Sequence, residues 1–408
     1  MRMCGTRSIG VSGTRCFWSG RPAASAGGGG YAPSRVILFL HHRYRTSGGE
    51  ERAVQQLCDL VPRRLGEPVR LLERDSAGLG AGAAAAGLLR GGTRPEEVAA
   101  AVRESGARIV HAHNLQPTFG WRALAAARAA GARTVLHLHN YRLVCAVATC
   151  VDPAGRDCLR CHGRDTRPGV RLRCRGAAGE AVAYAAGLAR GLAPTLAHAD
   201  AVAVPSAFAR DRLVALGVPL GDRPVHVVPN VVDTFAERSA AAAGTYALVA
   251  SRLAREKGVE VAIDACRAAG VPLVIAADGP EEAALRARAA GGDVRFAGRV
   301  PRAELDALRA GAALELVPSR AAETFGLAAV EAMAAGVPVV ASRVGAMAAI
   351  VPEDGLVPSG DVAALTAAVA ARYGDAAAGE RGIAAARAAA APEHAERALR
   401  ALYAAAAG

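Results

Sequence analysis

Residues 314–342 read LELVPSRAAETFGLAAVEAMAAGVPVVAS. The stretch begins and ends with short apolar runs, Leu314–Val317 and Val337–Ala341, which are typical of buried strands. The segment between them starts as a loop and continues with apolar residues at the three- and four-residue spacing of a helix. Strand, loop, helix and strand in this order form the repeating unit of a parallel sheet. The stretch therefore predicts an α/β fold.

The same alternation extends along the chain on both sides of this stretch. Apolar runs in the first half predict strands over residues 36–40, 69–72, 107–111, 134–138, 201–204 and 225–228. A second set predicts strands over residues 246–250, 273–276, 294–296, 314–317 and 337–341. Helix-length segments separate most of these runs, so each set predicts a sheet covered by helices on both faces. We expect an α/β protein with two Rossmann-like, doubly wound domains that face each other across a cleft.

The 408 residues fit two domains of about 200 residues each. Residues 1–33 lack periodicity and the apolar stretch of a secretory signal, so we expect a disordered extension there, with an overlong start of the sequence as the alternative. An N-terminal domain is expected over 34–235, with a Cys- and Arg-rich insertion at 145–175, and a C-terminal domain over 236–390. The last helix, within 391–408, is expected to pack back on the N-terminal domain.

Positive charge is concentrated in the first half of the chain. Residues 1–235 carry 31 Arg and 17 Asp or Glu (+14), residues 236–408 carry 18 Arg or Lys and 20 Asp or Glu (−2), and the sum is +12. Seven arginines fall within residues 156–175, a density that favours an anionic lipid surface, a phosphorylated acceptor or nucleic acid, with a solvated loop as the alternative. No run of about 18 apolar residues is present. We expect a cytoplasmic protein with peripheral contact at the inner face of the membrane.

A single lysine stands among the 49 basic residues of the chain, and it is Lys257. It lies with Arg252 on the loop that follows the first strand of the second domain, just before a helix start, where anions are favoured. Lysine is a compact point charge and arginine a planar fork, so a site that places one cation on a phosphate oxygen distinguishes them. Two cations at this place could neutralise a diphosphate. Chance survival of one lysine codon is the alternative.

Two carboxylates mark the stretch quoted above. Glu323 lies just before the helix and Glu331 eight residues later, at most about 12 Å apart if the segment is helical. That distance is comparable to the reach across a nucleotide sugar, although spacing alone favours Glu331 as a solvent-facing helix former. Asp278 and Gly279 follow another strand of the second domain, and an ordinary turn with a helix cap is the simpler reading of them.

In this order the motifs resemble those of retaining glycosyltransferases of the GT-B fold, family four. The resemblance rests on the two glutamates with seven residues between them, together with Gly48-Gly49-Glu50, His139-Asn140, Val228-Pro229-Asn230, Arg252 with Lys257, Asp278-Gly279-Pro280 and Phe296-Ala297-Gly298. It covers nearly all of the chain after Val36. Several ordered motifs are far more specific than any one of them.

The resemblance implies that Arg252 and Lys257 bind the diphosphate of a nucleotide-sugar donor. It implies that Glu331 accepts hydrogen bonds from the ribose and that Glu323 contacts the transferred sugar. The other donor-binding residues that it implies are Gly48, Gly49, Asp278, Gly279, Phe325, Gly326 and Leu327.

A histidine of the first domain is expected close to the reacting carbon. His139 matches the family motif best, and His137, His111 and His113 compete with it. For each of them a structural histidine, hydrogen-bonded at a strand end, is the simpler reading.

The implied chemistry is departure of a nucleoside diphosphate from a sugar through an oxocarbenium-like transition state. We expect no metal and no other cofactor in catalysis, because the chain has no Asp-x-Asp motif and the two cations can neutralise the leaving group. The acceptor is expected to be a glycan, a lipid-linked or a small molecule, used in making a cell-envelope polysaccharide. A sugar-nucleotide epimerase or a phosphorylase on the same fold is an alternative.

Five cysteines cluster in the insertion, and they are Cys145, Cys150, Cys158, Cys161 and Cys174. The C-x-x-C spacing of Cys158 and Cys161 is that of a zinc knuckle, so a structural zinc site competes here with unpaired thiols. A zinc-dependent nucleic-acid binder would also explain the cysteines and the basic half. That reading leaves the glutamate motif unexplained, so no nucleic-acid partner is expected.

Overall fold

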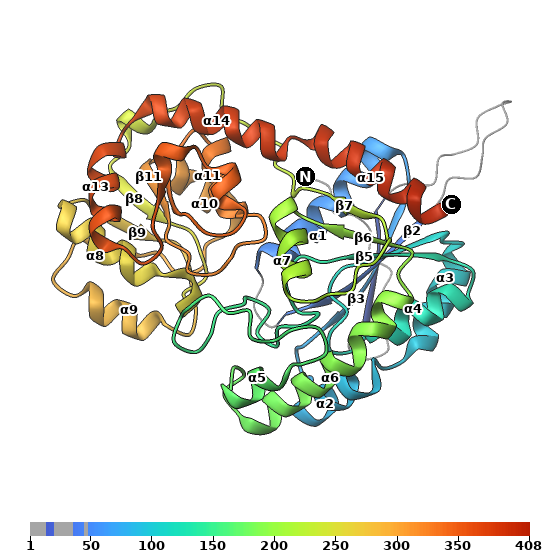
Figure 1. Cartoon of the computed structure of the whole chain (residues 1–408). Coiled ribbons are helices and arrows are strands. Elements are labelled where there is room, and N and C mark those ends of the chain that lie inside the picture. Colours follow the sequence, from blue (N-terminus) through green and yellow to red (C-terminus); the bar gives the residue numbers. More distant parts are fainter. Residues whose placement is uncertain (1–13, 20–35, 45–47) are drawn as a thin grey trace, which may run out of the picture. The chain divides into compact units, whose positions relative to one another are not determined.

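The computed structural model describes residues 14–19, 36–44 and 48–408 of the chain. Its contacts divide the chain into two compact units, which are treated separately below (Figure 1). The first unit contains residues up to Ala148, Leu159–Val228 and Glu393–Gly408. The second contains Thr149–Cys158 and Pro229–Pro392. The insertion predicted at 145–175 therefore contributes residues to both units.

A seven-stranded sheet forms the centre of the first unit, with the strand order β1-β3-β2-β4-β5-β6-β7. The strands β2 to β7 are parallel, as their alternation with helices predicts. Their bounds are Ile37–Arg43 (β2), Val69–Asp75 (β3), Ile109–Ala112 (β4), Arg133–His137 (β5), Ala201–Val204 (β6) and Val225–Val227 (β7). Every residue of β4 and β6 is buried, so these central strands are apolar on both faces apart from His111.

Helices separate these strands in the sequence, as Figure 1 shows. They are α1 (Gly49–Leu60), continued by a π-helical turn at Val61–Leu65, then α2 (Ala81–Arg90), α3 (Pro95–Ser105), α4 (Gly120–Ala129), α5 (Arg167–Arg171), α6 (Ala178–Ala197) and α7 (Ala207–Ala215). The helices α2 and α6 pack closely where Gly187 faces Leu88, since a Cβ on Gly187 would lie 3.0 Å from the Leu88 Cβ.

The strand β1 corrects one sequence-based expectation. Thr14–Ser19 pair antiparallel with β3, from Thr14 opposite Arg74 to Ser19 opposite Val69. A disordered extension over residues 1–33 is therefore wrong for these six residues, which add an edge strand. The rest of that range lies outside the described residues.

A six-stranded parallel sheet forms the second unit, in the order β10-β9-β8-β11-β12-β13. The strands are β8 (Tyr246–Val249), β9 (Leu273–Ile275), β10 (Val294–Phe296), β11 (Ala312–Val317), β12 (Val339–Ser342) and β13 (Leu356–Val357). Its helices are α8 (Val259–Ala269), α9 (Glu282–Ala289), α10 (Arg302–Ala310), α11 (Leu327–Ala334), α12 (Met347–Ile350), α13 (Val362–Arg372) and α14 (Ala376–Ala390). Short 3-10 turns lie at Ala241–Ala243, Arg255–Lys257 and Glu353–Gly355.

Two apolar clusters, one on each face of this sheet, hold the second unit together. One packs α8 and α13 against the sheet through residues such as Ile263 and Val369. The other packs α11 and α14 through residues such as Met333 and Ala386. Helices on both faces make this a doubly wound sheet, so the α/β fold with two Rossmann-like units is confirmed.

The last helix, α15 (Pro392–Ala407), packs on the first unit, to which Glu393–Gly408 belong. The Tyr403 hydroxyl lies 2.9 Å from His111 Nδ1, and Arg400 donates to the Arg64 carbonyl at 2.7 Å.

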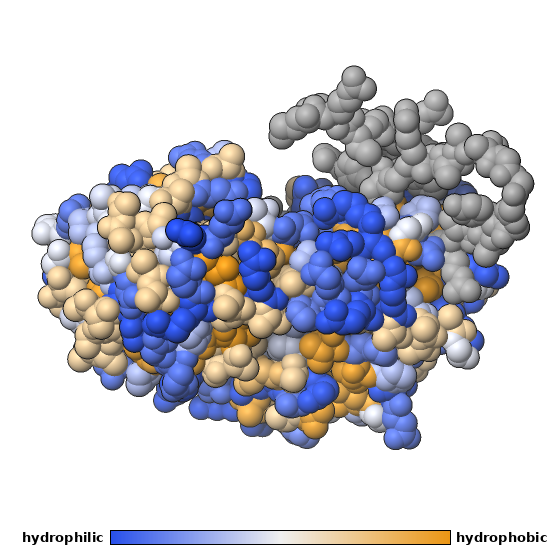
Figure 2. All heavy atoms as spheres, turned by 90° about the horizontal axis from the view of Figure 1, so that it is seen from above, coloured by the Kyte–Doolittle hydropathy of each residue, from blue (hydrophilic) through white to orange (hydrophobic). Residues whose placement is uncertain are grey.

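Hydrophilic and hydrophobic residues are both exposed on the face drawn in Figure 2. Among the described residues, no helix has the length and apolar character that crossing a membrane requires.

Candidate functional site in the second unit

Two loops at one edge of the second sheet are bound to each other. They follow the neighbouring parallel strands β8 and β11, whose carboxyl ends meet at the same edge. The Glu256 carbonyl accepts hydrogen bonds from the Arg320 amide at 2.8 Å and from the Ser319 hydroxyl at 3.3 Å. Gly258, with φ +63°, packs so tightly that a Cβ would lie 2.1 Å from the Pro318 carbonyl oxygen. The loop of Arg252 and the loop of Glu323 therefore form one site.

Lys257 and Glu323 form an ion pair at the centre of this site. The Lys257 Nζ donates to Glu323 Oε1 at 2.6 Å, and the Ser319 hydroxyl donates to the same oxygen at 2.6 Å. Burial acts to raise the pKa of Glu323, but the Lys257 charge and the two hydrogen bonds outweigh it, and the pKa lies below its ordinary value. Glu323 is therefore ionised at neutral pH, and its charge holds the ammonium in place.

The backbone of Glu323 is fixed by the loop after β12. The Ala346 amide donates to the Glu323 carbonyl at 2.9 Å. Gly345 has φ +63°, and a Cβ there would lie 2.3 Å from that carbonyl oxygen. Only glycine fits this backbone and this close approach. Gly345 was not singled out in the sequence because no motif marks it.

Arg252 lies on the same loop as Lys257, and its guanidinium donates to Glu256 four residues later. Its side chain is 47% exposed. Asp278 also has an arginine partner, since Arg299 makes two hydrogen bonds to it at 2.8 and 3.0 Å. Gly279 lies against the backbone of Leu253, where a Cβ would come within 2.3 Å of the carbonyl oxygen. The arrangement ties the Asp278 loop to the loop that carries Arg252.

Glu331 is buried, which corrects the reading of a solvent-facing helix former. It lies on α11 and is 6% exposed. Arg302 donates to its Oε1 at 2.7 Å and Arg309 to its Oε2 at 2.9 Å. Arg309 also makes two hydrogen bonds to Glu315, a fully buried residue of β11.

These four side chains form a network of two carboxylates and two guanidinium groups, in which Glu315, Glu331 and Arg309 are buried and Arg302 is 40% exposed. Burial raises the pKa of Glu315 in spite of Arg309 beside it. The sequence carried one signal for the network, because Glu315 interrupts an apolar strand and a buried carboxylate needs a partner. Its arginines come from α10, which no motif indicated.

The remaining predicted residues of this unit, Phe325, Gly326 and Leu327, lie at the start of α11. Gly326 precedes the helix with φ +85°, and a Cβ there would lie 2.8 Å from Met347 Cγ. Phe325 is 3% exposed and packs in the apolar cluster of α11 and α14, with Leu327 at its edge. The helix therefore begins beside Glu323, as the loop-and-helix pattern predicts.

Candidate functional site in the first unit

Gly48 and Gly49 begin helix α1 in the first unit. The Gly48 amide donates to the Glu51 carboxylate at 2.7 Å, which caps the helix. The next residue, Glu50, accepts hydrogen bonds from Asn140 at 2.7 Å and from the Tyr44 hydroxyl at 3.2 Å. Burial first, and then the charge of Glu51, raise the pKa of Glu50 to about 7. The two glycine positions therefore adjoin a carboxyl group whose protonation changes near neutral pH.

His139 follows β5 and is 9% exposed. Its Nε2 lies 2.9 Å from His113 Nδ1, and its ring stacks on His137 with centroids 4.1 Å apart. Burial is the largest cause that holds the pKa of His139 well below its ordinary value, and the neighbouring histidines act in the same direction. The ring is therefore neutral at pH 7 and can donate a hydrogen bond without carrying charge.

A cavity of about 50 Å³ adjoins His139 in this unit. Its lining includes polar groups from the carboxyl ends of β4 and β5 and from α1, and apolar or glycine positions on α2 and α6. The polar residues Glu50, His113, Asn114, Asn140 and Arg142 gather at the strand ends. At about 50 Å³ the cavity is far smaller than the roughly 300–1,000 Å³ of a usual ligand pocket, so it has room for a water or one small group.

The cysteine cluster stays a prediction. Cys150 and Cys158 belong to the second unit and Cys145, Cys161 and Cys174 to the first, and all five are thiols without a disulfide. In the described part of the chain, one group of His, Cys, Asp or Glu side chains lies close enough to hold a metal, and it consists of three histidines.

Models of two glycosyltransferase families match the chain, one in its first half and one in its second. The family described as "Glycosyl transferase 4-like domain" matches residues 46–231, and the family "Glycosyl transferases group 1" matches residues 244–375. Together they cover most of both units.

Curated relatives match part of the chain. A GDP-mannose-dependent alpha-(1-6)-phosphatidylinositol dimannoside mannosyltransferase of Mycobacterium tuberculosis is 36% identical over 175 residues, 40% of this chain and 46% of that protein. A phosphatidyl-myo-inositol mannosyltransferase of Mycobacterium leprae is 40% identical over 126 residues, 28% of this chain and 33% of that protein. The chain thus spans less than half the length of these relatives.

Solved structures share the whole fold. Sucrose-phosphate synthase from Thermosynechococcus elongatus superposes with a TM-score of 0.65 at 19% identity, over 90% of this chain and 98% of that chain. Anabaena HepE in complex with UDP-glucose gives a TM-score of 0.60 at 18% identity, over 90% and 99%. With these matches and its two doubly wound units, the chain belongs to the group 1 glycosyltransferases with the GT-B fold.

Proposed function

We propose that the chain is a retaining glycosyltransferase that moves a sugar from a nucleoside-diphosphate sugar to a glycan, a lipid-linked or a small-molecule acceptor. The observation that carries the proposal is the Lys257–Glu323 ion pair beside the start of α8, where the chain's one lysine is held at 2.6 Å by a carboxylate. A diphosphate placed at this helix start would meet backbone amides and two cations. Glu323 would then contact the sugar that is transferred.

The reaction breaks the bond between the anomeric carbon and the donor's phosphate oxygen, and the acceptor's hydroxyl oxygen forms the new bond to that carbon on the same face. The hydroxyl proton passes to the departing phosphate oxygen. Negative charge grows on the departing diphosphate, and Arg252 and Lys257 would stabilise it. His139 is neutral, so it would donate a hydrogen bond to the sugar without adding a charge near the oxocarbenium-like carbon. With two cations on the diphosphate, we propose that transfer needs no added Mg²⁺ or Mn²⁺.

The donor base and the acceptor are proposed only as classes. Anabaena HepE is solved with UDP-glucose, and the mycobacterial relative is described as GDP-mannose-dependent. These printed names support a nucleotide sugar and leave its base open. The names of the two mycobacterial relatives each contain a phosphatidyl-inositol group, which supports a lipid-linked acceptor.

A groove of about 450 Å³ lies between α5 and α6. It supports contact of the first unit with an anionic lipid surface that carries the acceptor. Arg164, Asp165 and Arg167 line it together with Val182, which is 52% exposed, and Arg167 makes two hydrogen bonds to Asp165. One net positive charge therefore remains beside exposed apolar groups, an arrangement that favours the surface of an acidic bilayer. Co-sedimentation with vesicles that contain an anionic lipid tests this role, and unchanged sedimentation of the Arg164→Ser, Arg167→Ser double variant would count against it.

A thermal-shift screen of UDP-, GDP- and ADP-sugars tests the donor site. We expect at least one to raise the melting temperature of the wild type, because a ligand that binds the native state stabilises it. The same sugar should stabilise the Lys257→Arg variant and fail to stabilise Glu331→Ala. If no nucleotide sugar stabilises the wild type, the donor assignment fails. Release of a nucleoside diphosphate only in the presence of an acceptor would exclude the epimerase alternative.

A further inference from the structure

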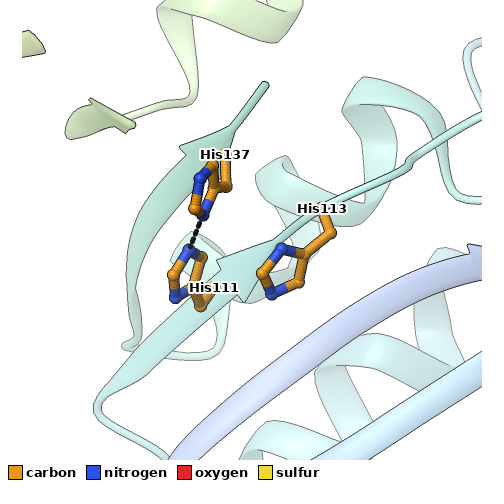
Figure 3. A group of neighbouring side chains, drawn as sticks. All are labelled: His111, His113 and His137. Carbon is orange, nitrogen blue, oxygen red and sulfur yellow. Dashed lines mark hydrogen bonds between the residues drawn. The ribbon is translucent and has the colours of Figure 1, made fainter. Parts of the chain in front are cut away.

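Three buried histidines of the first unit gather at neighbouring strands of the sheet. His111 lies on β4, His137 ends β5, and His113 follows β4, and their side chains are drawn in Figure 3. One ring nitrogen from each comes within 4.8 Å of the other two. His111 is 0% exposed, His137 1% and His113 4%, so bulk water does not reach the three rings.

Two ring nitrogens of this trio have no hydrogen-bond partner although they are buried. They are Nε2 of His113 and Nε2 of His137. Leaving a buried polar atom unpaired costs about 1–3 kcal/mol, so two in one cluster call for a ligand. The cavity described above is lined by both His113 and His137, so a ligand in it can reach these rings.

The third ring is held in the way that metal-binding histidines usually are. His111 Nδ1 lies 2.9 Å from the Tyr403 hydroxyl of α15, and its Nε2 lies 3.2 Å from His137 Nδ1 (Figure 3). A ligating histidine typically bonds through its second nitrogen to an oxygen, which fixes the ring. Two nitrogens on the same Zn²⁺ lie roughly 3.4 Å apart when each bond is about 2.1 Å, a separation that the His111–His137 pair already has.

The donors of this trio are imidazole nitrogens, and the trio includes no carboxylate. Nitrogen donors select transition metals over Mg²⁺ or Ca²⁺.

We propose that His111, His113 and His137 bind one divalent first-row transition ion, Zn²⁺ in the first place. Three imidazoles leave a fourth position open toward the cavity, where about 50 Å³ has room for a bound water. The ion would bind the unpaired His113 Nε2 together with His111 Nε2 and His137 Nδ1, and through His111 and Tyr403 it would stabilise the packing of α15 on the sheet. The site is separate from the cysteine cluster and does not depend on the proposed transfer reaction.

The full chain, stripped with a chelator and dialysed, is titrated with Zn²⁺ and with Co²⁺. We expect about one equivalent of tightly held metal that persists in the Cys158→Ser, Cys161→Ser variant. The cobalt form should show visible d–d bands without a sulfur-to-cobalt charge-transfer band, because the ligands are nitrogen and oxygen. A charge-transfer band from thiolate, with loss of the metal in the cysteine variant, would overturn the assignment to the histidines.

His113→Gln and His137→Gln test the ligands, and His41→Gln is the matched control. His41 is also buried in this cluster, and both of its ring nitrogens are unpaired. We expect the two ligand variants to lose the equivalent of metal and the zinc-dependent rise in melting temperature, while the control retains both. Circular dichroism identifies any variant that does not fold. Equal metal content in all three folded variants, or a wild type that binds no Zn²⁺ or Co²⁺, would contradict the site.

Discussion

The Lys257 ammonium lies 2.6 Å from Glu323 Oε1, although 66 residues separate the two in the sequence. The side chains are 26% and 18% exposed, so the pair is accessible to a ligand yet partly shielded from solvent. A diphosphate and Glu323 would compete for the same ammonium. Donor binding would therefore shift part of the lysine's interaction from the carboxylate to the phosphate.

Replacing Lys257 by arginine should separate binding from turnover. The guanidinium keeps the charge, so donor affinity should change only a few-fold, but its planar fork cannot reproduce a point contact with both Glu323 and a phosphate. We expect kcat to fall about 100-fold. Arg255→Lys is the control, since Arg255 lies on the same loop and donates to the Pro153 carbonyl at 2.7 Å. Equal kcat values for wild type and Lys257→Arg would refute the point-charge role.

Gly345→Ala should displace Glu323. The new Cβ would meet the Glu323 backbone at 2.3 Å and force an L-residue into φ +63°. We expect a loss of about 2–4 kcal/mol in the free energy of unfolding, and weaker donor binding. Gly270→Ala is the matched control, because Gly270 has φ +67° with open space around it and reports the backbone strain alone. Urea denaturation measures the free energy of unfolding of both variants. Equal losses in Gly345→Ala and Gly270→Ala would show that the contact with Glu323 has no effect.

Arg309→Met should strongly destabilise the second unit. Arg309 is 2% exposed and is shared by Glu315 and Glu331, so its removal leaves buried carboxylates without their main partner. Breaking a buried ion pair in this way costs about 3–5 kcal/mol. Arg302 contacts Glu331 from a position that is 40% exposed, and Arg302→Met should cost less than about 1 kcal/mol. Similar unfolding midpoints for the two variants would contradict the network.

Glu50 should make the stability of the first unit depend on pH. Its pKa is about 7 in the folded chain against an ordinary value of 4.5, so the folded state favours the protonated form. That contribution is complete below about pH 4.5 and is lost as the pH rises through 7. From pH 5 to 8 the free energy of unfolding should fall by up to about 3 kcal/mol more in the wild type than in Glu50→Gln. Parallel stability curves would rule this out.

The strands and the ordered loops could be predicted because they depend on local pattern. The strands over residues 201–204 and 294–296 were predicted with the bounds that the structure has. Lys257 and Glu323 were each placed beside a helix start. Their direct contact could not be predicted, because it depends on how two loops pack at one sheet edge.

Long-range contacts explain what the sequence did not indicate. The strand Thr14–Ser19 forms by pairing with β3, 50 to 60 residues away, and six residues without an apolar-polar alternation are too short a signal to predict that pairing. Glu331 of α11 is paired with two arginines of α10. The spacing of residues within α11 does not indicate where α10 packs, so this pairing could not be predicted. The histidine trio likewise assembles from two strands, so each histidine read singly looks like an ordinary strand-end residue.

The central claim is that Arg252 and Lys257 bind a diphosphate, and isothermal titration calorimetry with matched nucleoside mono- and diphosphates tests it most directly. For the base that the thermal-shift screen selects, we predict that the wild type binds the diphosphate at least 10-fold more tightly than the monophosphate, because two charge-assisted contacts are added. The Arg252→Ala, Lys257→Ala double variant should lose this preference while its affinity for the monophosphate stays within a few-fold. A wild type without the preference, or a double variant that keeps it, would contradict the account.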